Sequence, residues 1–368
     1  MIQGIVPAEI AAEGQAIRAT LDESLLSARA AAEALRAGGV RRIYVTGNGT
    51  SYHSALAAAT AYRRLAAADD PTVIALGAGE LRNYLPALDA RDAVVGISAS
   101  GEFRDVIAIF DELRGRIPTV GVVHVPGSTL ARVTTDTVLS AGGPSHVPVM
   151  TKTFVSTLAA THLLLGELLG GARAASVREA LARAADDVDA AVAAALPLVE
   201  QLADELVGFE HMFVVGSGNA TAAALEAALK LKEMALVHAE GAESWEMATG
   251  AATIVGPGTV VVALAPLGTG CAATLDVARH AVSWGARVVE VGPGTGSGPE
   301  IEAAAWLPMP ATSAEDYAPL TVVAPVAMLA FVLARRRGHD PDHPDWVERY
   351  HSQGLRHIVG VQNSGEVD

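Results

Sequence analysis

The sequence predicts an α/β protein made of two doubly wound parallel sheets in tandem, and an internal repeat is the first observation behind this prediction. RRIYVTGNGTSYHSALAAA begins at Arg41, and EHMFVVGSGNATAAALEAA begins at Glu210. With Gly47 set on Gly216, both stretches read as an apolar strand, a G-x-G turn and an alanine-rich helix. Further apolar strands follow in each copy, and such strands alternating with amphipathic helices are typical of parallel sheets covered on both faces.

The repeat also sets the expected domain boundaries. We expect a helical N-terminal segment over residues 1–34, a first domain over 35–175, a second over 200–335 and a C-terminal tail over 336–368 that lies as a flap on the body. The most apolar run, residues 318–334, has about the length of one membrane span. Nothing else in the chain resembles a membrane protein, so we expect a buried helix there and no contact with a membrane.

Composition excludes several classes of partner. The 368 residues carry 26 basic and 41 acidic side chains, a net charge of −15, without a block of Lys or Arg, so nucleic acid is not expected to bind. Cys271 is the only cysteine, which excludes an intramolecular disulfide and suits a reducing cytoplasm. Residues 1–14 lack the apolar segment of a secretion signal, so a cytoplasmic location is expected. No motif indicates a metal or an organic cofactor.

Hydroxyl-rich turns follow two strands of the first repeat. GNGTS supplies Thr50 and Ser51, and SASGE supplies Ser98 and Ser100, each at the start of a helix. Free N–H groups and the helix dipole favour an anion at such places, and hydroxyls add donors that suit a phosphate. Simple N-capping is the plainer alternative, but a third such turn at Thr151 favours an anion site. The third glycine of a dinucleotide fingerprint is absent from both G-x-G turns.

The second repeat carries charged residues on an otherwise apolar helix. Glu226, Lys230 and Glu233 are spaced by four and three residues, which places them on one helix face. Solvated ion pairs are the commoner explanation for such spacing. The flanking residues are almost wholly apolar, so we expect this helix and its charges to be buried.

Six motifs in one order now carry a family resemblance: TSYHS, S-x-SGE, VPGSTLAR, TKTF, ALEAALKLKE and HAE. They resemble the sugar isomerase (SIS) family, in particular the isomerase half of glutamine–fructose-6-phosphate transaminase, over about residues 35–335. The resemblance implies two flavodoxin-like domains, a sugar 6-phosphate as ligand and an enediol intermediate. It makes Glu233 the proton shuttle and Lys230 its neighbour. It also implies a homodimer or larger homo-oligomer whose subunits share the site.

The chain departs from the family pattern at several positions. Ala99 and Phe103 replace a Gln and a Thr that touch phosphate, and Met150 replaces a serine that contacts sugar. Thr249 stands where the family has its ring-opening His, and Arg349 is nearest to the place of a C-terminal lysine. Among His53, His124, His146, His343 and His351, we take His146 and His351 as the best candidates to replace the ring-opening His. The expected substrate contacts are Gly49, Thr50, Ser51, Ser98, Ala99, Ser100, Glu102, Phe103, Met150, Thr151 and Thr249.

Two classes of function fit these residues. The first is an aldose–ketose isomerase, or a deaminase or deglycase of amino sugar phosphates, because no glutaminase half with its cysteine nucleophile is found. The second is a sugar-phosphate-binding sensor without catalysis, which the missing His and Lys favour and the retained Glu233 and Lys230 disfavour. A weaker third hypothesis is a subunit that receives ammonia from a separate glutaminase.

Overall fold

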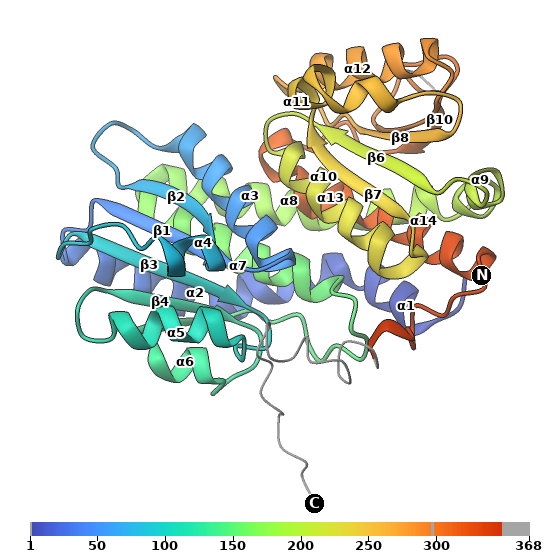
Figure 1. Ribbon diagram of the computed structural model, residues 1–368. Coiled ribbons are helices and arrows are strands. Elements are labelled where there is room, and N and C mark those ends of the chain that lie inside the picture. Colours follow the sequence, from blue (N-terminus) through green and yellow to red (C-terminus); the bar gives the residue numbers. More distant parts are fainter. Residues whose placement is uncertain (1, 296–297, 348–368) are drawn as a thin grey trace, which may run out of the picture. The chain divides into compact units, whose positions relative to one another are not determined.

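The computed structural model describes residues 2–295 and 298–347, and the chain in it forms two compact units (Figure 1). The first-repeat unit comprises Ala19–Gly143, Ser156–Glu179 and residues 345–347. The second-repeat unit comprises residues 2–18, Pro144–Val155 and Ala180–Pro344. The chain passes between the units several times, so the segment Pro144–Val155, which contains Thr151, belongs to the second-repeat unit although the segments before and after it belong to the first.

The first-repeat unit holds one five-stranded parallel sheet in the order β2-β1-β3-β4-β5. Its strands are β1 (Arg42–Gly47), β2 (Thr72–Gly77), β3 (Asp92–Ser98), β4 (Thr119–Val123) and β5 (Asp136–Leu139). The chain leaves β1 towards β2 on one side and continues to β3 on the other side. The carboxyl ends of β1 and β3 therefore flank the point where the strand order reverses, which is where open α/β sheets bind ligands.

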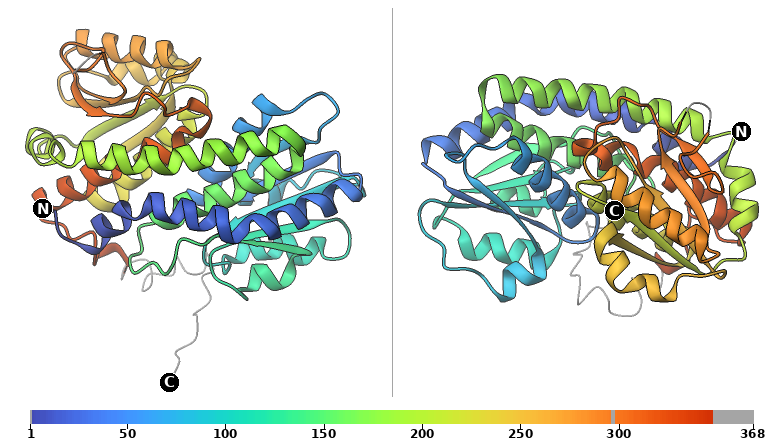
Figure 2. Two further views of the ribbon diagram at one scale, coloured as in Figure 1. Left: turned by 180° about the vertical axis from the view of Figure 1, so that it is seen from behind. Right: turned by 90° about the horizontal axis from the view of Figure 1, so that it is seen from above.

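Helices cover both faces of this sheet. They are α3 (Thr50–Leu65), α4 (Ala78–Asn83), α5 (Arg104–Leu113) and α6 (Thr129–Val133), with parts of α2 (Glu13–Ala37), α7 (Lys152–Leu169) and α8 (Gly171–Ala195). Figure 1 shows α5 and α6 on one face of the sheet, and Figure 2, seen from behind, shows α2 on the other. Coverage of both faces explains why β3 is buried along its whole length and carries no polar side chain between Asp92 and Ser98.

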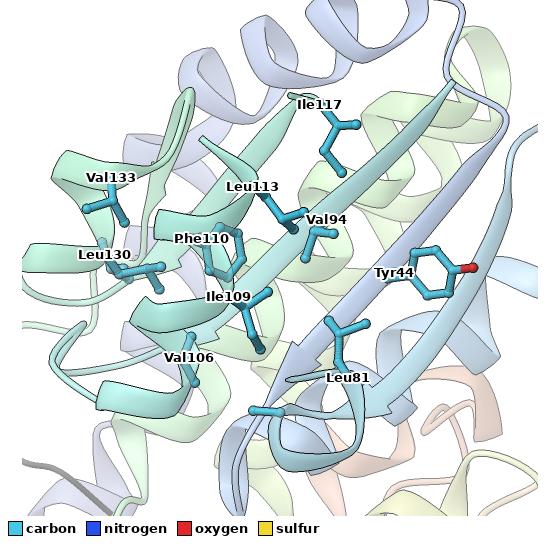
Figure 3. Close-up of a cluster of buried hydrophobic side chains, with 12 residues drawn as sticks. Tyr44, Leu81, Val94, Val106, Ile109, Phe110, Leu113, Ile117, Leu130 and Val133 are labelled. Atoms are coloured by element: carbon cyan, nitrogen blue, oxygen red, sulfur yellow. The ribbon is translucent and has the colours of Figure 1, made fainter. Parts of the chain in front are cut away.

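A cluster of buried side chains joins α4, α5 and α6 to the strands (Figure 3). Phe110 of α5 lies in it together with Val94 of β3 and Leu130 of α6. Gly96 of β3 faces the Phe110 ring so closely that a Cβ there would lie 2.4 Å from two ring carbons. The bare backbone at Gly96 is therefore what lets α5 approach the sheet.

The second-repeat unit has the same topology, with the order β10-β9-β8-β6-β7. Its strands are β6 (His211–Gly216), β7 (His238–Glu243), β8 (Thr259–Leu264), β9 (Arg287–Gly292) and β10 (Ala305–Pro308). Its helices are α1 (Ile5–Ala11), α9 (Val199–Leu206), α10 (Ala220–Lys230), α11 (Ser244–Thr249), α12 (Cys271–Ser283), α13 (Ala318–Thr321) and α14 (Val323–Arg336). Short helical turns lie at Leu231–Ala235, Ala251–Ile254 and Glu315–Tyr317. Two doubly wound parallel sheets confirm the fold predicted from the repeat.

The apolar run expected to be a buried helix forms α13 and α14. Within the part of the chain that the structure describes, Glu315–Arg336 is the one helical stretch long and apolar enough to cross a membrane, and its apolar window is entirely buried. The helix α14 packs against α1, α9 and α10. Just beyond it, the carboxylate of Asp342 accepts hydrogen bonds from the amides of Ile5 and Val6 and so holds the start of α1.

The contact between Gly96 and Phe110 makes a stability prediction. We expect Gly96→Ala to lower the free energy of unfolding by roughly 1–3 kcal/mol, because the added methyl overfills a packed interior. Gly79→Ala in α4 is the matched control, since a Cβ there meets nothing within 4 Å. Alanine is a better helix former than glycine, so the control should be neutral or slightly stabilising. Urea unfolding measures both, and equal effects of the two substitutions would contradict the packing argument.

Candidate functional site

The first hydroxyl turn lies at the end of β1. Gly49 has φ +50° and precedes α3, whose first residues Thr50 and Ser51 are buried. A Cβ on Gly47 would lie 2.6 Å from the Cβ of Ser51 and 2.9 Å from the carbonyl oxygen of Ile97. Glycine at this position thus lets the start of α3 lie directly against the strand ends, where its amides and dipole favour an anion.

The second hydroxyl turn follows β3 and is tied to the first. The amide of Gly101, with φ +68°, donates to Ser98 Oγ at 3.0 Å, and the amide of Glu102 donates to Ser100 Oγ at 3.3 Å. Asn48 Nδ2 in the first turn donates to Asp105 Oδ2 of α5 at 2.6 Å. The structure therefore brings the two predicted turns together at the point where the strand order reverses.

A third turn of this unit, which contains Ser128 and Thr129, packs against the second turn and is bonded to it. The sequence alone assigned this turn no role. Glu102 was expected to contact ligand, but its carboxylate accepts hydrogen bonds from the amide of Thr129 at 2.8 Å and from its hydroxyl at 2.7 Å. A Cβ on Gly101 would lie 2.1 Å from Ser128 Oγ, so Ser128 packs directly on the turn. The motif VPGSTLAR, which contains both residues, was the available signal for this brace.

Two further residues of the second turn make contacts within the first-repeat unit. The carbonyl of Ala99 accepts hydrogen bonds from the amides of His124 and Val125 at 3.0 and 3.2 Å. Phe103 is the N-cap residue of α5 and packs against the buried cluster of Figure 3. These contacts shape the turn, and a direct contact of either side chain with a ligand stays a prediction.

Met150 and Thr151 lie in the second-repeat unit, at the start of α7. Thr151 is 2% exposed, and its hydroxyl has no hydrogen-bond partner among residues 2–295 and 298–347. A buried hydroxyl of this kind normally finds a partner, so it fits a ligand-binding role. Next to it, Lys152 Nζ lies 3.9 Å from the carboxylate of Glu9 in α1. The contribution of Thr151 to the phosphate site stays a prediction.

The carboxylates and the lysine predicted on one helix face form one cluster in the second-repeat unit, and burial is confirmed for Glu226 and Lys230 but not for Glu233. Lys230 Nζ lies 3.2 Å from Glu226 Oε1 and 2.6 Å from Glu233 Oε2. The side chains of Glu226 and Lys230 are 0% and 1% exposed, whereas that of Glu233 is 24% exposed. Glu233 is therefore the member of the cluster that a ligand can reach.

The backbone at Glu233 is unusual as well. Glu233 lies in a π-helical turn, Leu231–Ala235, which continues α10 and ends at Leu236 in the left-handed region with φ 52°. Single π-turns are rare and often occur at functional sites, and the left-handed region is costly for a residue such as leucine. The helix α14 packs against both α10 and this turn, so an apolar surface lies beside the charges.

The charges around Lys230 oppose the effect of burial. Burial alone would lower the pKa of Lys230, but the negative charges of Glu226 and Glu233 and their hydrogen bonds outweigh it and raise this pKa. Burial raises the pKa of Glu13, in the first turn of α2, well above the usual value. Lys230 opposes that shift, and Asp189, Glu226 and Glu9 reinforce it. Lys230 is thus held as an ammonium ion beside an acid that retains its proton to higher pH.

Of the remaining predicted residues, Thr249 and His146 are exposed, and two lie outside the described residues. Thr249 is the exposed last residue of α11, and its hydroxyl donates to the carbonyl of Glu246 at 3.0 Å. The side chain of His146 is exposed, and its backbone amide donates to Glu9 at 2.8 Å. Arg349 and His351 lie outside the described residues. Over residues 2–295 and 298–347, no group of three or more His, Cys, Asp or Glu side chains is arranged to hold a metal.

Comparison with known proteins places both repeats in one family. The SIS domain matches residues 39–166 and 205–333. Glutamine–fructose-6-phosphate aminotransferase [isomerizing] of Pyrococcus horikoshii is 32% identical over 307 residues, which cover 82% of this chain and 50% of that protein. The chain therefore spans about half the length of the curated relatives it matches.

Solved structures agree on the fold. The C-terminal domain of glucosamine-fructose-6-phosphate aminotransferase from Francisella tularensis superposes with a TM-score of 0.84 at 23% identity, covering 93% of this chain and 99% of that one. Glucosamine-6-phosphate deaminase from Thermotoga maritima gives a TM-score of 0.72 at 21% identity, covering 93% and 98%. Since the family match takes in both repeats and more than half of the residues, the chain belongs to the SIS domain family.

Proposed function

We propose that this chain is a phosphosugar enzyme that moves a proton between neighbouring carbons of the sugar through an enediol. The hydroxyl turns after β1 and β3 are assigned to the phosphate, and Glu233 is assigned to the proton. The observation that carries the proposal is the Lys230–Glu233 contact of 2.6 Å, in which only the carboxylate reaches the surface. A partly buried carboxylate that is held in place by a partner and remains accessible is suited to general base catalysis.

The chemistry assigns one task to each group. Glu233 takes the proton from the carbon beside the carbonyl, and the electron pair moves to the carbonyl oxygen, which gives the enediolate. The carboxyl then returns the proton to the carbon that carried the carbonyl. The hydroxyl proton on the other carbon moves to the enediolate oxygen, so that the carbonyl now forms on that other carbon. Lys230 remains an ammonium ion because its pKa is raised, so the proton is carried by the carboxylate and not by the amine. These steps serve an aldose–ketose isomerase. In an amino sugar phosphate the same proton transfer leaves an imine in place of the new carbonyl, and water hydrolyses this imine to release the amine, as a deaminase or deglycase requires.

The relatives indicate the class of substrate. Their names refer to fructose 6-phosphate and glucosamine 6-phosphate, and the paired hydroxyl turns of this chain suit a phosphate. We therefore propose a hexose or hexosamine 6-phosphate as the substrate. The proposal further includes a shared site in a homodimer or larger homo-oligomer, as the family resemblance implies.

A sensor without catalysis is the second candidate, and Thr249 favours it. This residue occupies the place of the family's ring-opening His, and its hydroxyl is bonded to its own helix. A sensor would bind the phosphosugar and shift in melting temperature without any exchange of carbon-bound protons. Turnover on an open-chain substrate with none on a ring form would instead show that only the ring-opening step is missing.

Substitution of the proposed base tests the enzyme hypothesis. We expect Glu233→Gln to slow exchange of the C2 proton by about 10²–10⁴-fold, because the amide cannot accept a proton. Binding of the phosphosugar should change little. Proton NMR in D2O measures the exchange, and Glu200→Gln on the exposed surface of α9 is the matched control. Full exchange activity in Glu233→Gln would contradict the role of Glu233.

Substitution in the second turn tests phosphate binding separately. We expect Ser100→Ala to weaken binding of fructose 6-phosphate by roughly 10- to 100-fold, since a hydrogen bond to a charged group contributes about 1.5–3 kcal/mol. Weak binding of unphosphorylated fructose should stay unchanged. Thr60→Ala, farther along α3 in the same unit, is the control for calorimetric titration. An equal loss for both sugars would show that Ser100 does not contact the phosphate.

The buried acid beside Lys230 predicts a dependence of stability on pH. The folded-state pKa of Glu13 exceeds its unfolded value of about 4.5, so the folded chain holds an extra proton above that pH. The stabilisation that this extra proton on Glu13 provides is complete below pH 4.5. As the pH rises towards the folded-state pKa, the free energy of unfolding falls by up to about 1.4 kcal/mol per pH unit.

Glu13→Gln removes this titration while it keeps the shape of the side chain. The variant should therefore gain stability relative to the parent chain as the pH rises from 4.5 to 8. Urea unfolding across this range measures the difference, and Glu200→Gln should show no such trend. A constant difference between Glu13→Gln and the parent would contradict the raised pKa.

A further inference from the structure

The second repeat keeps the two turns of the first but has lost three of their serines. Gly218 after β6, with φ +61°, corresponds to Gly49, and Gly268 after β8 corresponds to Gly101. Alanine and leucine replace the serines, since Ala220, Ala265 and Leu267 stand where the first repeat has Ser51, Ser98 and Ser100. The strand order reverses between β6 and β8, as it does between β1 and β3. The backbone of the two turns is thus retained without the three serines.

A carboxylate of the same chain lies between these two turns. Glu315 is 6% exposed, and its Oε2 accepts hydrogen bonds from the amide of Gly270 at 3.1 Å and the hydroxyl of Thr269 at 3.3 Å. A Cβ on Gly218 would lie 1.8 Å from Oε1, and a Cβ on Gly268 would lie 1.9 Å from Oε2. Both glycines therefore contact the carboxylate, one against each oxygen.

The segment that carries Glu315 is fixed to the turns by its backbone. The amide of Glu315 donates to the carbonyl of Leu267 at 3.2 Å, and Ala314 forms a parallel bridge with Leu267. Asn219 Nδ2 donates to the carbonyl of Asp316 at 2.5 Å. The carboxylate is consequently held between the starts of α10 and α12, whose dipoles favour negative charge.

We infer that the second repeat retains an anion-binding cradle, formed by Gly218 and Gly268–Gly270, and that Glu315 fills it as a built-in ligand. The buried carboxylate inside the turns, and not the helix ends alone, supports this assignment. One oxygen against each glycine turn is the placement that a phosphate would have. The cradle is therefore closed to outside anions for as long as Glu315 remains in it. This inference does not rest on the proposed enzymatic function.

Removal of the carboxylate should convert the cradle into a phosphate site. We expect Glu315→Ala to lower the melting temperature by several degrees in chloride, and inorganic phosphate at matched ionic strength to restore it in a saturable way. The response is measured as the difference from the parent chain, which carries the first-repeat turns unchanged. General stabilisation by phosphate and any binding to the first repeat cancel in this difference. Glu302→Ala, an exposed carboxylate of the same unit, should behave as the parent.

The outcomes are distinct. A phosphate response in Glu315→Ala no larger than that of the parent would overturn the inference, as would an unchanged melting temperature in chloride. If Glu315→Ala does not fold in chloride, recovery of the fold in phosphate supports the cradle. Glu315→Gln is the second variant, which keeps the volume of the side chain and removes its charge. It should melt below the parent and show no phosphate response, because the amide still fills the space.

A Glu315→Gln chain as stable as the parent at low and high salt would show that the turns do not hold a charge. An absent phosphosugar activity would leave these differences unaffected.

Discussion

The ammonium group of Lys230 is the interaction on which the account of the second-repeat unit depends. It is almost completely buried, and the negative charges of Glu226 and Glu233 offset the free-energy cost of burying its positive charge. An unpartnered charge there would be strongly unfavourable, so the cluster fixes both carboxylates around one point. The apolar helix α14 and the buried acid Glu13 complete the surroundings. Of these three side chains, that of Glu233 alone extends to the surface, and it is therefore the group to which we assign the proton transfer.

In both repeats, glycines at the strand ends let other groups approach the turns closely. In the first, Gly47 and Gly101 let the helix starts and hydroxyl turns meet closely, and Asn48 joins them through Asp105. In the second, Gly218 and Gly268 enclose the carboxylate of Glu315. The internal comparison is informative because the second repeat shows a negative group at the place where the first is proposed to hold a phosphate. We therefore propose that one scaffold holds an external anion in the first repeat and the internal carboxylate of Glu315 in the second.

Sequence patterns predicted the fold and the charged cluster but not the contacts between distant segments. The strand–turn–helix repeat was recognisable because buried parallel strands leave continuous apolar runs, and the spacing of Glu226, Lys230 and Glu233 defines one helix face. The π-turn at Glu233 could not be seen, since ALKLKEMA reads as an uninterrupted helix. Glu102 binding Thr129 and Glu315 binding Gly270 join residues 27 and 45 positions apart, and such pairings leave no periodic trace. Glycine turns that lack the three serines of the first repeat were the available hint of the filled cradle.

The most direct test of the account is proton NMR in D2O on the unmodified chain with a panel of hexose and hexosamine 6-phosphates. The account predicts that one of these sugars gains deuterium at C2, with interconversion of aldose and ketose or with release of amine. Melting temperatures recorded on the same samples would show which sugars bind. A sugar that raises the melting temperature while none of the panel exchanges its C2 proton would contradict the catalytic role of Glu233 and leave a phosphosugar-binding protein.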